Sequence, residues 1–547
     1  MELVFYNVEN KGMSGGDLPW ETKIMKRVAD TKYIFVSGGV ISGVGKGITA
    51  ASIGAVIKAK GLKVSMQKCD PYFNVDAGRL NPNEHGETFV TRDGAETDLD
   101  LGHYERFLDE ELIGDCTWSS GKLYKKLIDD ERAGKFGGKT VQMVPHVTGL
   151  IQDTFEENAR KFGSDVHIVE IGGTVGDLEG SHFVEAVREF PGRVGRENVF
   201  YVHVVFVPYL STSHEYKTKP AQNALRDLRE YGIIPDMVSA RIDAPTDDAP
   251  VIARKLATFC GIAEDAVVVM PNAGSVYEVP LQLVEAGVLG PLDRFVNHGA
   301  PDMSAWKDLQ KKIVTKRRRV VTVGLVAKYI DNSDTYLSVT EALKAAAWEV
   351  GVGLKIKWLE AEKAGAKDFA KVDGLLVPSG AGPRGVGGMI AAADYALEKD
   401  KPYLGICLGL QVAAIAACRR AGLKTANSEE FGANEHSHND VIYKAGEKMR
   451  LGDCSAKLME GSRVAGIYGT LDVVERHRHE YEVNRRFVDL MNAQGMEISG
   501  FSPDGMWAEY LEAPKLKYFV ATQSNPEYRS RPYRAHPLFR EFVRALL

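Results

Sequence analysis

The chain alternates short apolar runs, rich in Val and Ile, with longer stretches in which apolar residues recur at helical spacing. This alternation is typical of parallel sheets whose strands are joined by crossover helices. Six runs form a first series, at residues 33–37, 62–67, 166–171, 200–207, 237–241 and 266–270. A second series lies at residues 320–326, 355–359, 374–378 and 402–406. The pattern therefore predicts an α/β protein with two parallel-sheet domains.

A break in this pattern separates the two series. Between about Asn297 and Lys316 the periodicity is lost, and the segment ends in a basic run at residues 316–319. A run of like charge between two patterned regions is typical of a solvated linker. Residues 1–30 lack the apolar core of a signal peptide, so they resemble an extension. We predict an extension at 1–30, a first domain at 31–297, a linker at 298–319 and a second domain at 320–547.

The composition mainly excludes several classes of protein. Of 547 residues, 26% are charged and 44% are apolar, and the net charge of −6 argues against a protein that wraps nucleic acid. Apolar runs stay well short of the ~18 residues of a membrane-spanning helix. The six cysteines form no CxxC pair, which argues against a disulfide framework or a zinc ribbon. We expect a cytoplasmic protein with no nucleic-acid and no membrane partner.

The first candidate for chemistry is the glycine-rich loop SGGVISGVGKG at residues 37–47, between a predicted strand and a predicted helix. Glycines let the backbone curl so that its amides, the helix N-terminus and Lys46 face phosphate oxygens. The loop departs from the strict phosphate-loop pattern, because Val40 replaces a Gly and Gly47 replaces the magnesium-binding Ser or Thr. Phosphate binding and a plain glycine-rich turn both stay open on these residues alone.

Charged residues recur at the ends of later predicted strands. Lys68 ends one strand, and Glu170 ends another, directly before two glycines. Four acids also lie close together in sequence, at Asp93, Glu96, Asp98 and Asp100. Acids so close would repel one another, and a shared Mg²⁺ would explain them, since it binds one or two carboxylates together with substrate phosphates. A strand-end acid that faces water is the alternative for Glu170.

These segments resemble the CTP synthase family along almost the whole chain. The matching blocks include GGVISGVGKG, KCDPYFNVDAG, HGETFVTRDGAETDLDLGHYERF, VEIGGTVGDLE, EYKTKPAQ, GICLGLQ and VERHRHEYEVN, in the family's order. The resemblance implies an N-terminal P-loop, dethiobiotin-synthetase-like synthetase domain and a C-terminal class I glutamine amidotransferase-like domain of flavodoxin-like fold. It also implies a ligase reaction: ATP phosphorylates O4 of UTP, and ammonia then displaces the phosphate at C4 to give CTP.

The same resemblance implies site residues and partners. Lys46 would hold the phosphates of ATP, Lys68 would lie near the transferred phosphoryl group, and His85 would flank the route of ammonia. Asp100 and Glu170 would bind Mg²⁺. ATP and UTP would contact Ser42, Gly43, Val44, Gly45, Lys46, Gly47 and Ile48, and UTP or inhibiting CTP would contact Asp177, Leu178, Glu179, Lys217, Thr218, Lys219, Pro220, Ala221, Gln222 and Lys255. A homotetramer with nucleotide sites between subunits is implied as well.

The second domain keeps a nucleophile but not its base. Cys407, in GICLG, reads as a nucleophile elbow, and the N-terminus of the helix that follows favours a thiolate. A class I amidotransferase pairs this thiolate with a His and a Glu, but here Asn525 replaces the His and Glu527 follows. An amide cannot accept and return a proton near neutral pH. The alternative for Cys407 is a small apolar residue retained in a buried turn.

Three further departures affect the same pocket. The oxyanion segment, Pro-Gly-Gly-Phe-Gly in the family, reads PSGAG at residues 378–382, with Gly380 retained. Glu480 stands where the family has an Arg that pairs with the α-carboxylate of glutamine. The segment 431–449 is shorter than the family's loop, whereas Gln411 and Glu430 match positions that line the glutamine pocket. These changes predict that glutamine hydrolysis is lost.

Three functions stay open. The first is a CTP synthase that uses free ammonia and keeps its amidotransferase domain as a structural lobe. The second activates a uracil nucleotide in the same way but attaches a different amine, whose ammonium group Glu480 could meet. The third is a non-catalytic, nucleotide-binding regulatory subunit of a CTP synthase assembly, against which the intact synthetase residues argue.

Overall fold

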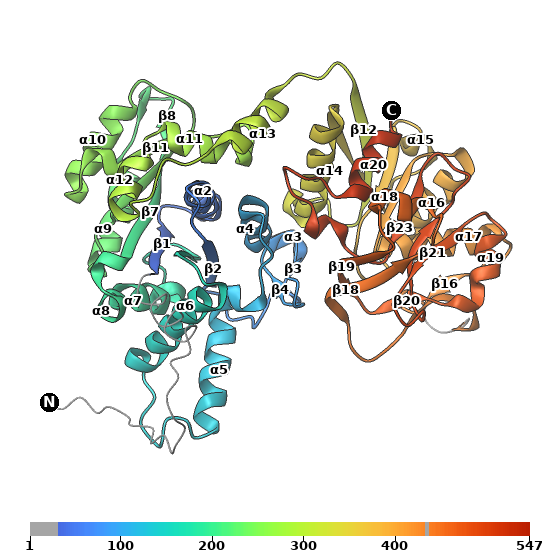
Figure 1. The fold of residues 1–547 in the computed structure, drawn as a ribbon, viewed down its shortest axis with the longest axis horizontal. Coiled ribbons are helices and arrows are strands. Elements are labelled where there is room, and N and C mark those ends of the chain that lie inside the picture. The colour runs from blue at the N-terminus through green and yellow to red at the C-terminus, as the bar shows by residue number, and fades with distance from the viewer. Residues whose placement is uncertain (1–30, 433–436) are drawn as a thin grey trace, which may run out of the picture.

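The computed structural model describes residues 31–432 and 437–547, so the predicted extension at residues 1–30 lies outside the described residues. Figure 1 shows two α/β bodies side by side, the first coloured blue to green and the second yellow to red. Within the described ranges, no helix is long and apolar enough to cross a membrane.

The first body is built on a seven-stranded parallel sheet, as the first series of apolar runs predicts. Its strands, in spatial order, are β11 (Val267–Pro271), β10 (Met237–Ile242), β7 (Val199–Val207), β1 (Lys32–Gly38), β6 (Val166–Ile171), β2 (Val64–Asp70) and β5 (Thr117–Ser119). Its longer helices are α2 (Lys46–Ala59), α4 (Asp100–Leu108), α5 (Ser120–Arg132), α6 (Thr148–Phe162), α7 (Ser181–Glu189), α9 (Lys219–Glu230) and α10 (Ala249–Cys260). The short edge strand β5 is not predicted by the pattern.

Strand β1 shows why these strands read as unbroken apolar runs. Ile34 packs on one face of the sheet in the core that also holds Ile53 of α2, whereas Phe35 packs on Phe155 of α6 on the other face. Because helices cover both faces, the strand has no solvent side and is apolar at consecutive positions. β1 lies between β6 and β7, which places the loop after β1 near the middle of the carboxyl edge of the sheet.

The second body is built on a nine-stranded mixed sheet. Its parallel strands are β13 (Gly353–Glu360), β12 (Val320–Ala327), β14 (Gly374–Val377), β15 (Tyr403–Ile406) and β23 (Phe519–Thr522). Antiparallel pairing adds β22 (Ala508–Glu512), β21 (Glu497–Phe501), β18 (Arg450–Leu458) and β19 (Asp472–His479). Helices α14 (Leu337–Val350) and α20 (Pro537–Ala545) pack on one face, and α16 (Val386–Lys399) and α17 (Leu408–Arg420) on the other.

The antiparallel strands of this sheet are not predicted by the apolar pattern because they carry buried charged residues. β19 reads DVVERHRH, and Glu475, Arg476, His477 and His479 in it are all buried. Each of these side chains has a polar partner, which is the condition under which charged groups are found inside proteins. A pattern that looks for apolar residues therefore misses this strand.

The segment predicted as a solvated linker contains a short helix that packs on both bodies, whereas its basic run at residues 316–319 is mostly exposed. α13 (Ser304–Val314) buries Trp306 and Leu309. The ring of Trp306 lies 5.5 Å from that of Phe107 in the first body and 5.3 Å from that of Tyr533 in the second. Trp306, Leu309 and Ile313 recur at helical spacing, so the sequence carried a signal for this helix that the prediction of a linker overlooked.

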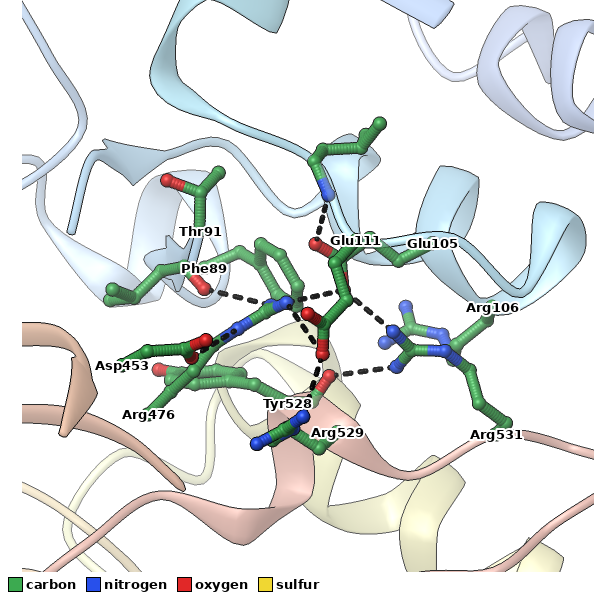
Figure 2. A network of polar contacts seen from close by, with 12 residues as sticks. Phe89, Thr91, Glu105, Arg106, Glu111, Asp453, Arg476, Tyr528, Arg529 and Arg531 are labelled. Atoms are coloured by element: carbon green, nitrogen blue, oxygen red, sulfur yellow. Dashed lines mark hydrogen bonds and ion pairs between the residues drawn. The ribbon is translucent and has the colours of Figure 1, made fainter. Parts of the chain in front are cut away.

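A buried charge network joins the two bodies (Figure 2). Oε2 of Glu105, on α4, lies 3.0 Å from Nη2 of Arg476 and 2.9 Å from Nη2 of Arg531, and all three side chains are buried. Arg476 also donates a hydrogen bond to the carbonyl of Val90 at 3.0 Å. Because the acid and the two arginines belong to different bodies, separating the bodies would leave charges without partners. The network thus fixes the second body against the segment that follows β2.

Candidate functional site

The loop after β1 and the start of α2 form the first part of the candidate site. Gly45 precedes the helix with φ of 92°, and Val40 also adopts the left-handed region, with φ of 82°. That conformation is rare for a β-branched residue and costs roughly 1–2 kcal/mol. The backbone therefore takes a glycine-like shape at Val40, where the sequence departs from the phosphate-loop pattern.

Lys46 is buried and donates to the carbonyl of Gly173 at 2.7 Å, and burial lowers the pKa of Lys46.

The second departure from the phosphate-loop pattern, Gly47, is explained by the carboxylates that lie next to it. A Cβ atom at Gly47 would lie 2.6 Å from Oδ1 of Asp100 and 3.2 Å from Oε2 of Glu170. A Ser or Thr there would force the loop or the Asp100 side chain to shift. The oxygens of Asp100 and Glu170 themselves lie beside the loop, so oxygen donors are present at this point although the hydroxyl is missing.

Lys68, near the end of β2, is surrounded by three carboxylates. Its Nζ lies 2.6 Å from Asp100, 2.9 Å from Glu170 and 3.7 Å from Asp70. Burial opposes the charge of Lys68, but these carboxylates outweigh it and hold the pKa of Lys68 well above its usual value. Burial raises the pKa of Asp70, whose Oδ2 has no hydrogen-bond partner. One ammonium group thus faces three acids and offsets part of their negative charge.

The four acids between positions 93 and 100 do not share a site, which corrects the prediction for two of them. Asp93 accepts from the backbone amide of Gly114 at 2.9 Å, and Glu96 pairs with Arg478 of the second body at 2.8 Å. Asp100 reaches Lys68, and burial together with Asp100 raises the pKa of the neighbouring Asp98 to about 6.

Asp100 and Glu170 are the protein's candidate metal ligands. Over residues 31–432 and 437–547, no group of three or more His, Cys, Asp or Glu side chains is placed to hold a metal ion. Two carboxylates fit Mg²⁺ only if phosphate oxygens and water complete its six positions. The donor set therefore suits a metal that arrives with a nucleotide.

The remaining predicted nucleotide residues lie on loops and helix starts of the first body. The segment 217–222 spans the end of a short hairpin and the first turn of α9, and α9 touches the glycine-rich loop: a Cβ at Gly39 would lie 2.4 Å from Cβ of Ala224. Ser42, Lys255 and the stretch 177–179 are exposed. His85 is exposed at the end of α3 (Pro82–His85), which contacts the second body through a hydrogen bond from Thr335 to the carbonyl of Pro82 at 3.0 Å.

A cavity of about 480 Å³ lies where the second body meets residues 78–88 of the first. The predicted residues of the amidotransferase site all line it: Gly380, Cys407, Gln411, Glu430, Glu480, Asn525 and Glu527. The tertiary structure thus gathers residues that the sequence distributes over several loops.

Cys407 occupies the turn between β15 and α17 with φ of 53°, a strained conformation for a residue other than glycine. Its Sγ lies 3.7 Å from the carbonyl oxygen of Arg478. Burial, reinforced by the carboxylates of Glu527 and Glu430, raises the pKa of the Cys407 thiol to about 12. The expectation that the helix N-terminus favours a thiolate here is therefore wrong, because burial and nearby acids outweigh the helix.

Asn525 is held as a triad histidine would be, by a carboxylate. Its Nδ2 donates to Oε1 of Glu527 at 2.9 Å, and both side chains are buried. Burial raises the pKa of Glu527 to about 8. Oδ1 of Asn525 and Oε2 of Glu527 have no hydrogen-bond partner. The pair keeps a triad-like arrangement but places an amide where proton exchange is needed.

His479 also lines the cavity, although the sequence offered no reason to place it, His477 or His536 against Cys407. Nε2 of His479 lies 2.9 Å from Nδ1 of His477, and its Nδ1 lies 3.2 Å from the carbonyl oxygen of Tyr481. Burial lowers the pKa of His479 to about 3. Because both ring nitrogens are engaged and the ring stays neutral, His479 is a poor substitute for the missing base.

Lys328 is a second residue that the sequence analysis missed, although its place directly after strand β12 was a usable signal. Its Nζ donates to the carbonyls of Ala381, at 3.0 Å, and Gly382, and burial lowers the pKa of Lys328 to about 8. The amide of Gly382 donates to Glu430 at 2.6 Å. Backbone groups of the turn that replaces the oxyanion segment are therefore already hydrogen-bonded to Lys328 and Glu430. At the rim, Glu480 pairs with Lys444 at 3.0 Å.

Comparison with known proteins matches both bodies. The family model described as CTP synthase N-terminus matches residues 32–297, and that of class-I glutamine amidotransferase matches residues 331–545. The CTP synthase of Methanocaldococcus jannaschii is 45% identical over 536 residues, which cover 94% of this chain and 98% of that protein. That of Corynebacterium jeikeium is 46% identical over 544 residues, covering 95% and 98%. Among solved structures, the glutaminase domain of Trypanosoma brucei CTPS with bound acivicin is 35% identical and covers 41% of this chain and 93% of that chain, with a TM-score of 0.39.

Proposed function

Because this chain belongs to the CTP synthase family and is a ligase of that type, we propose that it joins ammonia taken from solution, rather than from glutamine, to C4 of UTP. ATP supplies the phosphoryl group that activates O4, and the products are CTP, ADP and phosphate. One observation carries the choice of ammonia: Asn525, hydrogen-bonded to Glu527, stands in the cavity of Cys407 where a proton-exchanging base is required.

In the first body, the proposed chemistry relies on charge neutralisation. Phosphoryl transfer needs positioning and electrostatic stabilisation more than covalent catalysis. Lys46 would bind the phosphates of ATP, and Lys68, held between Asp100 and Glu170, would lie by the transferred group. Mg²⁺ bound by the two carboxylates would neutralise phosphate charge. The segments 42–48, 177–179 and 217–222, with Lys255, would bind UTP or CTP, as in the family pattern.

In the second body, the environment of the Cys407 thiol adds support to the proposed loss of glutaminase activity. A nucleophilic cysteine must be deprotonated or have a base that takes its proton. Burial disfavours the thiolate of Cys407, and neither Asn525 nor His479 would serve as the base that takes its proton. The body would then act as a lobe that completes the cavity and the interface with the first body.

Product mass spectrometry tests this proposal. Purified protein with ATP, UTP and Mg²⁺ should form CTP from ammonium chloride but not from glutamine. Cys407→Ala should keep the ammonia-dependent rate within about twofold of wild type. CTP formation from glutamine, or a large loss of the ammonia-dependent rate in Cys407→Ala, would contradict the proposal.

A second candidate, ligation of a different amine to the activated uracil, is favoured by Glu480, which lines the cavity and could pair with an ammonium group where the family pattern has an Arg. A heavier cytidine nucleotide formed only with a pool of cellular amines would select this candidate. No phosphate release with any amine would instead favour the non-catalytic, nucleotide-binding subunit.

A further inference from the structure

The first body has a cavity of its own, of about 550 Å³, at the amino edge of its sheet. Residues 232–236 and 262–266, which directly precede β10 and β11, contribute to its lining, as does Tyr201 near the start of β7. The strands of this sheet are parallel, so they all begin at one edge, and the glycine-rich loop after β1 lies at the other. The cavity is therefore separate from the site of the proposed reaction.

The lining of this cavity combines apolar side chains with arginines. The loop at residues 232–236 reads GIIPD, and Ile234 in it is 57% exposed. Three arginines and one acid also line the cavity: Arg188, Arg196, Arg294 and Asp236. Such a lining suits an occupant that presents an apolar surface flanked by carboxylates.

The acids next to these arginines leave room for further carboxylates. Arg196 pairs with Asp236 at 2.7 Å, and Arg294 pairs with Asp265 at 2.6 Å. Both pairs are largely exposed to solvent, and exposed ion pairs contribute little to stability. A guanidinium group has five N–H donors, so each arginine can bind a second carboxylate beside the first.

The part of the chain that the structure describes begins beside this cavity. Nζ of Lys32, in the first residue of β1, donates to the carbonyl of Glu197 at 2.9 Å and lies 5.3 Å from the centre of the Phe295 ring. Glu197 and Phe295 directly follow Arg196 and Arg294, which line the cavity. The extension that precedes β1 is therefore attached at the rim of the cavity.

We propose that residues 17–21 of this extension, Asp-Leu-Pro-Trp-Glu, occupy the cavity. Leu18, Pro19 and Trp20 would cover the apolar loop, and Asp17 and Glu21 would pair with the arginines. The 12 steps from residue 20 to residue 32 can span up to roughly 40 Å, which is ample for a segment attached at the rim. A tether of this kind also gives the segment a high local concentration. The match to the family model begins at residue 32, so the segment belongs to this chain and not to the matched family pattern.

Hydrogen–deuterium exchange of the full-length protein, read by mass spectrometry, tests this inference. Amides of residues 232–236 and 262–266 should exchange at least about threefold faster in Trp20→Ala than in wild type, because the cavity would be open to water. Phe5→Ala removes another aromatic side chain of the extension, so it is the matched control and should exchange as wild type does. Equal rates in wild type and Trp20→Ala, or the same acceleration in Phe5→Ala, would overturn the inference.

A pair of charge variants tests the role of the carboxylates. Asp17→Lys combined with Glu21→Lys should accelerate exchange at the same amides, because lysines would face the arginines. Glu2→Lys combined with Glu9→Lys makes the same change of charge outside the segment and should leave exchange unchanged. Equal exchange in the two double variants would overturn the inference. Unchanged exchange in β1 and β7 serves as the control for folding in every variant.

Protein concentration separates the extension from a second copy of the chain as the occupant. A segment tethered to its own cavity protects the amides to the same extent at every concentration. Protection in the wild type that rises with protein concentration would mean that another copy covers the cavity, and it would overturn the inference.

Discussion

Replacing Asn525 with histidine should not by itself restore glutamine use. The new imidazole would lie where Nδ2 now donates to Glu527 at 2.9 Å, so a hydrogen-bonded pair resembling a triad could form. The obstacle is the thiol, whose pKa is about 12. At pH 7.5 only about one thiol in 10⁴ to 10⁵ is ionised, which corresponds to roughly 6 kcal/mol against the thiolate.

A new histidine would offset only part of this free-energy cost of forming the thiolate. A positioned general base contributes about 10²- to 10⁴-fold, or roughly 3–5 kcal/mol. Glu480 would still repel the α-carboxylate of glutamine, by up to about 1 kcal/mol once solvent and Lys444 are allowed for. The turn at residues 380–382 would still be tied to Lys328 and Glu430.

The assay is CTP formation from glutamine without added ammonium, with ammonium-dependent CTP formation on the same preparation as the control for folding. For Asn525→His we expect a glutamine-dependent rate below about 1% of the ammonium-dependent rate. Adding Glu480→Arg should raise the glutamine-dependent rate about 10-fold over the single variant. A single Asn525→His variant whose glutamine-dependent rate comes within tenfold of its ammonium-dependent rate would refute the reasoning.

Three further predictions concern other parts of the molecule. Lys46→Ala should abolish phosphate release that depends on ATP and UTP, since the buried ammonium group would no longer face the phosphates, whereas Lys63→Ala, exposed before β2, should not; equal rates in a colorimetric phosphate assay would contradict this. Glu105→Gln should destabilise the folded protein by about 3 kcal/mol, because the fully buried Arg476 loses its nearest carboxylate and keeps only Asp453 and Glu111 at 3.8 and 3.9 Å, and urea unfolding measures the effect. Glu527 has a pKa raised from 4.5 to about 8, so the folded protein keeps a proton that the unfolded chain releases, and this group lowers stability progressively between pH 4.5 and 8. Glu527→Gln should therefore leave stability near wild type at pH 5 and raise it relative to wild type as the pH approaches 8, by at most ~1.4 kcal/mol per pH unit, and thermal unfolding at both pH values checks the sign.

The sequence determined most of the parallel strands of both sheets and singled out candidate site residues, but it did not predict the parallel strands β5 and β23. Strands buried on both faces, such as β1, are apolar at consecutive positions, and this pattern is visible without a structure. Lys46, Lys68, Asp100 and Glu170 could be singled out because loops and strand ends carry unusual residues there. Asn525 could be singled out because it breaks a known chemical pattern.

Only the tertiary structure decided which charges meet. Asp93, Glu96 and Asp100 are neighbours in sequence, yet they bind the Gly114 amide, Arg478 and Lys68 respectively. Spacing along a chain does not specify the direction of side chains in a loop, and a partner from another body leaves no local signal.

The ionisation of Cys407 shows the same limit. Its turn and the helix that follows are local features, and they favour a thiolate. Its burial and the carboxylates of Glu430 and Glu527 come from distant segments, and they reverse that preference. The sequence thus determined which groups are present, whereas the folded structure decided their protonation states and partners, because desolvation and Coulomb interactions depend on distances that only tertiary packing sets.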